Sequence, residues 1–201
     1  MRVKMMAGLI VLLLAVVVVA VAGCKATRSG YESAPYRVVL RDGKFEVRDY
    51  PALTLVETLM SSGGTNSADG SFNRLFRFIT GNNEASQKIA MTTPVFMSGN
   101  EKNRAMAFVM PAGEKVAQVP KPKDATVTVR EVAAGRYAIF RYSGGRNAKK
   151  EAEVERQLRA WMQAERLPAK LAPVFGYFDP PWIPAFLRRN EVMLLTESSS
   201  P

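Results

Sequence analysis

The sequence contains no histidine and only one cysteine, Cys24. Catalysis by Ser-His-Asp or Cys-His groups is therefore excluded, because both need an imidazole to carry the proton. A disulfide within the chain, a thiolate zinc site and a histidine-bound heme iron are excluded for the same lack of side chains. Any function of the folded domain must rest on other residues.

Carboxylates are scarce relative to cations, with 18 Asp and Glu against 28 Lys and Arg and a formal net charge of +10. Asp49, Glu57, Asp179 and Glu191 fall on different predicted elements, so no carboxylate pair for acid–base catalysis is visible. We therefore assign no catalytic residue and expect a protein that is not an enzyme. The scattered basic residues argue against nucleic acid and favour anionic lipid headgroups or an acidic ligand. A cationic surface that only keeps the protein soluble is an equally good interpretation.

The N-terminal residues have the layout of a secretory signal. Arg2 and Lys4 precede an apolar run at residues 7–21, and small residues then lead into Cys24. This ending resembles the bacterial lipobox, which implies cleavage before Cys24 and lipidation of that residue. An uncleaved membrane helix is the alternative, because the apolar run is almost long enough to span a bilayer. Lys25 stands where an aspartate would mark retention in the inner membrane, so the outer membrane is favoured.

These features divide the chain into four parts and predict a lipid-anchored, periplasm-facing protein of the bacterial cell envelope. The polar stretch after the cysteine is typical of a flexible tether. The rest is long enough for one domain with its own core, and we expect a monomer. The parts are a lipoprotein signal peptide at 1–23, the lipidated cysteine with its tether at 24–34, one domain at 35–197, and a loose tail at 198–201.

Within the domain, two weakly similar units follow each other at an offset of 82 residues, for example from Val47 to Val129. A fixed offset of this kind indicates an internal repeat. The sequence therefore predicts a duplicated strand-helix-strand-strand unit. The same offset relates apolar positions on two predicted helices, namely Phe72, Phe76 and Ile79 with Val154, Leu158 and Trp161.

Helical and strand spacings alternate along the domain and predict an α+β fold. Asp42-Gly43 is a good hairpin turn between short strands at 36–40 and 45–48. Apolar residues follow helical spacing over residues 71–80, and again over residues 148–166. Further strands are predicted at 52–60, 87–97, 104–110, 125–132, 136–142, 172–178 and 191–196.

Two distant segments carry the most specific signal. Residues 88–95 read Lys-Ile-Ala-Met-Thr-Thr-Pro-Val, and residues 176–182 read Gly-Tyr-Phe-Asp-Pro-Pro-Trp, followed by Arg-Arg-Asn-Glu-Val at 188–192. Each follows a predicted amphipathic helix, and together they resemble the signature of the SOUL heme-binding family over residues 36–196. The resemblance implies a distorted antiparallel β-barrel-like sheet with two packed α-helices. It also implies a shallow hydrophobic site for heme or another tetrapyrrole.

By this resemblance, the first helix and the loop after the Pro-Pro turn form the two walls of the cofactor-binding site. Arg188 and Arg189 are the candidates for contact with the propionates. The alternatives are that the helix residues belong to the core, that the loop is a lid, and that one arginine pairs with Glu191 to anchor the last strand. The implied wall residues are Phe72, Leu75, Phe76, Ile79, Trp182, Ile183 and Phe186.

The resemblance thus implies a tetrapyrrole carrier or buffer that binds without a histidine ligand. The residues that bind the metal stay unknown, with Met91 and Tyr177 as candidates for an axial ligand. The alternative is a binding module for another flat hydrophobic molecule, because duplicated α+β scaffolds of this shape also serve as effector-binding domains. An enzyme that modifies tetrapyrroles is a third interpretation.

Overall fold

The computed structural model describes residues 30–60, 70–99 and 103–196. They form one compact unit that begins at Glu32. None of the helices within these ranges is long and apolar enough to cross a membrane. The predicted signal peptide, the lipidation of Cys24 and the predicted tail lie outside the described residues and stay predictions.

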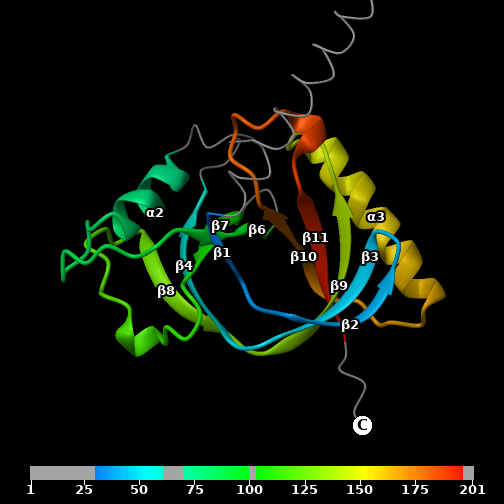
Figure 1. Cartoon of the computed structure of the whole chain (residues 1–201), viewed down its shortest axis with the longest axis horizontal. Helices are drawn as coiled ribbons and strands as arrows, with labels where there is room; N and C mark the ends of the chain where they lie inside the picture. Colours follow the sequence, from blue (N-terminus) through cyan, green and yellow to red (C-terminus); the bar gives the residue numbers. More distant parts are fainter. Residues whose placement is uncertain (1–29, 61–69, 100–102, 197–201) are drawn as a thin grey trace, which may run out of the picture. The chain divides into compact units, whose positions relative to one another are not determined.

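The fold is α+β, as predicted, and its main element is a nine-stranded antiparallel sheet (Figure 1). The strand order is β2-β3-β9-β11-β10-β6-β7-β4-β8. A separate two-stranded parallel pair joins β1 (Glu32–Ser33) to β5 (Thr92–Thr93). The strands of the main sheet are β2 (Arg37–Asp42), β3 (Phe45–Tyr50), β4 (Leu53–Leu59), β6 (Val95–Ser98), β7 (Ala105–Val109), β8 (Val127–Val132), β9 (Gly135–Tyr142), β10 (Lys170–Tyr177) and β11 (Asn190–Thr196).

The sheet is open, because β2 and β8 stand at the two ends of its strand order. The predicted barrel-like closure is therefore not confirmed. The predicted hairpin is present, with β2 and β3 joined by a turn in which Gly43 has a φ of 55°. The long strand predicted at 87–97 is reduced to the short strands β5 and β6, which flank Pro94. Proline has no N–H to donate to a ladder, which accounts for the interruption.

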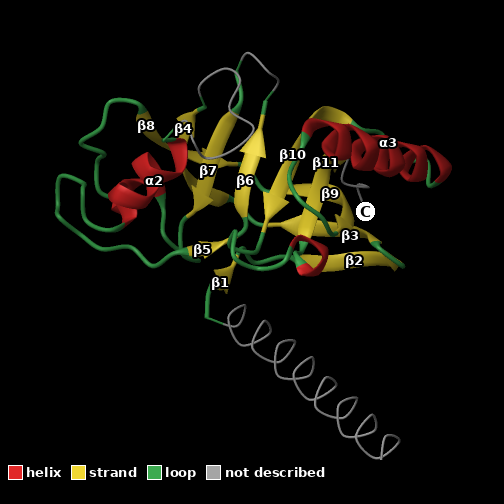
Figure 2. Ribbon diagram, turned by 90° about the horizontal axis from the view of Figure 1, so that it is seen from above, coloured by secondary structure: helices red, strands yellow, loops and turns green. Residues whose placement is uncertain are grey.

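Two helices, α2 (Ser71–Ile79) and α3 (Ala148–Ala164), cover one face of this sheet (Figure 2). α2 packs on β4 and β7, whereas α3 packs on β9 and β11. Phe175, which belongs to the apolar cluster under α3, lies opposite Met97, which belongs to the cluster under α2. Paired residues point to the same face of a sheet, so both helices lie on that face. Two short 3₁₀ turns are η2 (Val116–Gln118) and η3 (Ala185–Leu187).

α3 begins where the sequence provides a cap and turns its apolar stripe to the sheet. The Asn147 side chain accepts a hydrogen bond of 2.8 Å from the backbone N–H of Lys150, which satisfies a free donor of the first turn. Trp161 was expected to point inward and instead lies half-buried at the edge, where its ring stacks on Phe45 at 5.0 Å. The apolar residues of α3 that are fully buried are Val154, Leu158 and Met162.

The other face of the sheet carries no helix within the described part of the chain. Its apolar cluster includes Tyr50, Phe96, Ile139 and Met193. We call this side the helix-free face.

The pairing register has an internal symmetry. Val47 pairs with Ala138, and Val129 pairs with Val56, so a shift of 82 residues takes one pair into the other. The strand order from β3 to β8 likewise reverses onto itself when β3, β4, β6 and β7 exchange with β8, β9, β10 and β11. The duplication itself stays a prediction.

Candidate functional site

The predicted helix wall is divided between the core and the surface. Leu75 and Ile79 are buried at 0% and 3% exposure in the cluster under α2, so neither presents a surface to a ligand. Phe72 is half-buried and packs on Phe108, with ring centroids 5.3 Å apart. Phe76 is exposed, because the third apolar side chain that α2 turns to the sheet is Phe78. A nine-residue helix with this many apolar residues cannot direct all of them to one face.

The predicted loop wall is divided in the same way. Ile183 is buried at 4% exposure, whereas Trp182 and Phe186 are 71% and 75% exposed. The loop connects β10 to β11, and its 3₁₀ turn η3 accepts a hydrogen bond from the backbone N–H of Gly144, just ahead of α3. In both views α2 lies beside β4 and β8, away from this loop (Figures 1 and 2). The structure therefore does not bring the two predicted walls together.

The two predicted propionate-binding arginines both have partners within the protein. Arg188 donates from Nε to the Ile183 carbonyl at 2.7 Å and from Nη2 to the Pro181 carbonyl, so it stabilises the loop. Arg189 donates from Nε and Nη2 to Glu191 Oε1, at 3.0 and 2.7 Å, and its guanidinium lies over the Phe178 ring. Arg189 is thus the arginine that anchors the last strand.

A buried charged network, unexpected from the sequence, lies on the helix-free face around Arg48. This side chain is completely buried and donates from Nη1 and Nη2 to the two Glu191 oxygens, at 2.7 and 3.1 Å. It also donates from Nε to Glu46 at 2.6 Å and from Nη1 to the Tyr50 hydroxyl at 3.2 Å. Tyr36 covers the guanidinium, with its ring centroid 4.1 Å from Cζ. Charged groups this deeply buried are stable only when paired, and these are.

This network sets the protonation of Glu191. Burial acts to raise its pKa, but hydrogen bonds and charges from Arg48 and Arg189 outweigh burial and hold the pKa below the ordinary value of 4.5. On β3, the hydrogen bond from Arg136 likewise lowers the pKa of Asp49, against a smaller opposing effect of burial.

We expect the stability of the protein to depend on pH through these two carboxylates. A lowered folded-state pKa stabilises the fold fully above the unfolded value and loses its effect as the pH falls through the folded value. The free energy of unfolding should therefore fall below pH 4.5, the ordinary glutamate value. Urea denaturation over a pH series should show a shallower loss in Glu191→Gln, with Asp49→Asn reporting the separate share of Asp49. Equal pH dependence in wild type and Glu191→Gln would contradict this account.

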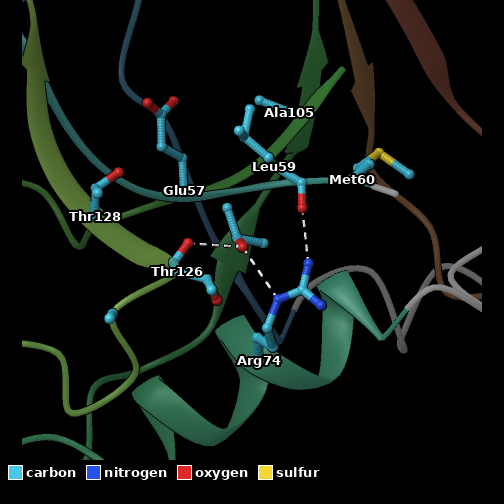
Figure 3. Close-up of a pocket in the computed structure, with 9 residues that line it drawn as sticks. Glu57, Leu59, Met60, Arg74, Ala105, Thr126 and Thr128 are labelled. Atoms are coloured by element: carbon cyan, nitrogen blue, oxygen red, sulfur yellow. Dashed lines mark hydrogen bonds between the residues drawn. The ribbon is translucent and has the colours of Figure 1, made fainter. Parts of the chain in front are cut away.

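A cavity of about 610 Å³ lies where β4 ends beside α2 (Figure 3). Its apolar lining comes from Leu59, Met60 and Ala105, and Leu59 is 65% exposed. Ligand pockets for small molecules usually measure about 300–1,000 Å³, so its size suits a molecule as large as a tetrapyrrole. Its remaining lining residues are Glu57, Thr58, Arg74, Ala125, Thr126 and Thr128.

Arg74 places a positive charge in the wall of this cavity. It donates from Nε to Thr58 Oγ1 at 3.1 Å and from Nη2 to the Leu59 carbonyl at 2.7 Å, so its guanidinium is held in position (Figure 3). Thr58 in turn donates to the Thr126 carbonyl at 2.9 Å. Sequence reasoning assigned Arg74 to the polar side of the helix but could not connect it with strands more than 50 residues further on.

A smaller groove of about 200 Å³ lies on the helix-free face. Aromatic rings of Tyr50, Phe96 and Tyr137 line it, with Leu171 at 78% exposure. It is too small for a tetrapyrrole but has the apolar lining that a smaller ligand needs.

The two candidate axial ligands lie outside both spaces. Tyr177 donates its hydroxyl to Glu151 at 2.5 Å, and burial raises the pKa of Tyr177 far above its ordinary value, which keeps the phenol protonated. Met91 is half-buried and packs against the cluster under α2. In the described ranges, no group of three or more His, Cys, Asp or Glu side chains could hold a metal ion.

Solved structures of low sequence identity share this fold. The C-terminal domain of EcmrR has a TM-score of 0.53 at 12% identity, covering 81% of this chain and 98% of that domain. An uncharacterized conserved protein from Listeria innocua has a TM-score of 0.56 at 10% identity, covering 77% and 92%. EcmrR in a complex with DNA has a TM-score of 0.58 at 12% identity and 76% coverage of this chain, which spans only 57% of that protein. Such low identities show the fold alone.

The family match is more specific. No curated protein matches the chain, but the model of the SOUL heme-binding protein family matches residues 31–195. The chain therefore belongs to the SOUL family, and the resemblance seen in the two sequence segments is confirmed. A family defined by heme binding supports heme or another tetrapyrrole as the ligand.

Proposed function

We propose that this protein binds heme or another tetrapyrrole in the cavity of Figure 3 and acts as a carrier or buffer rather than as an enzyme. The SOUL match over residues 31–195 is the observation that supports this function most. The cavity supports it further, because it combines a suitable volume, an apolar lining and one fixed cation.

The residues of the cavity fit the group. Leu59, Met60 and Ala105 provide apolar contact, and the guanidinium of Arg74 suits a propionate carboxylate. A bound heme would supply iron for ligation or redox chemistry. Because the chain contains no histidine, affinity should rest on buried area, at about 25 cal/mol per Å², and on the contact with Arg74. We expect dissociation constants near the micromolar range, about −8 kcal/mol.

We further propose that the protein works at the bacterial envelope, anchored through lipid on Cys24 and facing the periplasm. The support is the sequence alone, in which a positive start, an apolar run and small residues precede that cysteine. We also propose that the domain arose by duplication, which the 82-residue shift between paired strands supports.

Replacing Arg74 by glutamine should weaken hemin binding about tenfold, corresponding to 1.4 kcal/mol, because a charge-assisted hydrogen bond is lost. The dimethyl ester, which lacks the propionate charges, should bind both proteins equally. Arg74→Lys is the matched control that keeps the charge. Absorbance titrations measure all three, and iron-free protoporphyrin should bind about as well as hemin. Equal losses for hemin and its ester would show that Arg74 supports the fold and does not contact the ligand.

A second candidate function is binding of a smaller flat hydrophobic molecule in the groove on the helix-free face. The aromatic lining from Tyr50, Phe96 and Tyr137 favours it. A tetrapyrrole that failed to bind while a smaller aromatic compound saturated the groove would support this candidate over the first.

A further inference from the structure

The loop between β10 and β11 directs two large apolar side chains away from the protein. Trp182 and Phe186 are 71% and 75% exposed, although Ile183 between them is buried at 4%. Among the described residues, only Leu171 equals them in exposure among the large apolar side chains. Two aromatic rings displayed together on one loop indicate a contact surface more often than a single exposed residue does.

This display is held by the loop itself. The backbone N–H of Ile183 donates to the Pro180 carbonyl at 3.1 Å, and that of Leu187 donates to the Pro184 carbonyl at 2.9 Å. The Arg188 guanidinium then bonds to the carbonyls of Pro181 and Ile183. Prolines restrict the backbone further, so the two rings are presented at little entropic cost. Arg188 also leaves a positive charge at the base of the loop.

The loop lies close to the start of the domain. Arg189, at the base of the loop, donates a hydrogen bond to Tyr36, which closely follows β1. Only residues 25–31 separate Cys24 from β1. Seven residues reach at most about 25 Å when fully extended, so a lipid on Cys24 would keep this part of the domain near the bilayer.

We propose that Trp182 and Phe186 contact the membrane surface to which Cys24 anchors the protein, an inference that rests on the proposed lipidation. Tryptophan prefers the headgroup level of a bilayer, where its ring is apolar and its N–H stays hydrated. Anionic headgroups suit the excess of basic residues and the nearby Arg188. The lipid surface is favoured over a second copy of the chain because the sequence already provides an anchor next to this loop.

The chain offers an internal control, because Trp161 and Trp182 are its only tryptophans. The loop bonds to Gly144, just before α3, whereas Trp161 lies 13 residues along α3 from its first residue. At 1.5 Å per residue that is about 20 Å further away. Trp161→Phe leaves Trp182 as the sole reporter, and Trp182→Phe leaves Trp161. The replacement phenylalanine can keep the stacking of residue 161 on Phe45.

The test is fluorescence quenching of the full chain in phosphatidylethanolamine–phosphatidylglycerol vesicles that carry doxyl-labelled lipid. We expect the emission of Trp161→Phe to fall by roughly half, because Trp182 sits at the labelled surface. The emission of Trp182→Phe should stay unchanged. Phe186→Ser in the Trp161→Phe background should reduce the quenching.

Flotation of the same vesicles separates the two proposals. Protein that floats while Trp182 is not quenched overturns the loop contact and leaves the anchor standing. Protein that does not float contradicts both. If Trp182 is protected from the lipid quencher and from aqueous acrylamide alike, protein covers it, as in a dimer, and the lipid contact is wrong.

Discussion

Replacing Glu191 by alanine should lower the free energy of unfolding by about 3–5 kcal/mol, because it leaves the buried Arg48 charge without its bidentate partner. Arg48 and Glu191 are both completely buried, and Arg189 and Arg141 also face the Glu191 carboxylate, at 2.7 and 3.5 Å. The loss would be a large part of the roughly 5–15 kcal/mol that stabilises a typical domain. Urea denaturation followed by fluorescence measures it.

Two further variants give this result its meaning. Arg48→Met combined with Glu191→Leu should recover much of the lost stability, because buried pairs exchange for apolar residues at little cost. Arg159→Ala removes an exposed pair with Glu155 on α3 and should cost no more than about 0.5 kcal/mol. If Glu191→Ala cost as little as Arg159→Ala, the buried network would not stabilise the fold.

Local elements of the fold were predictable where the sequence itself provides the signal. The Asp42-Gly43 turn joins β2 to β3, and the Asn147 cap begins α3, as short-range chemistry requires. The partners of the strands were not predictable in the same way. β3 pairs with β9 almost 90 residues further on, and this choice depends on how all the strands pack together.

The candidate site was predictable in kind but not in place. The sequence identified the aromatic side chains of α2 and of the loop, but both segments contain more apolar residues than one buried face can take. Ile79 and Ile183 therefore enter the core while Phe76 and Trp182 remain exposed. Arg74 could be assigned to a cavity only once β4 and β8 were known to lie beside α2. The network around Arg48 also escaped detection, because its partners are distant in sequence.

The central claim, that a tetrapyrrole binds in the cavity of Figure 3, is tested most directly by filling that cavity. Thr128 is exposed on the edge strand β8 and lines the cavity, so Thr128→Trp should narrow it while the fold tolerates the larger side chain. Leu171→Trp is the matched control, because it places the same ring at an exposed position of the groove on the helix-free face.

Hemin absorbance titration of wild type and the two variants is the decisive measurement. We predict that Thr128→Trp lowers hemin affinity at least about tenfold, or 1.4 kcal/mol, because the ring occupies the volume that the porphyrin needs. Leu171→Trp should bind hemin like the wild type. Unchanged binding by Thr128→Trp, or a loss confined to Leu171→Trp, would contradict the assignment of the tetrapyrrole to this cavity.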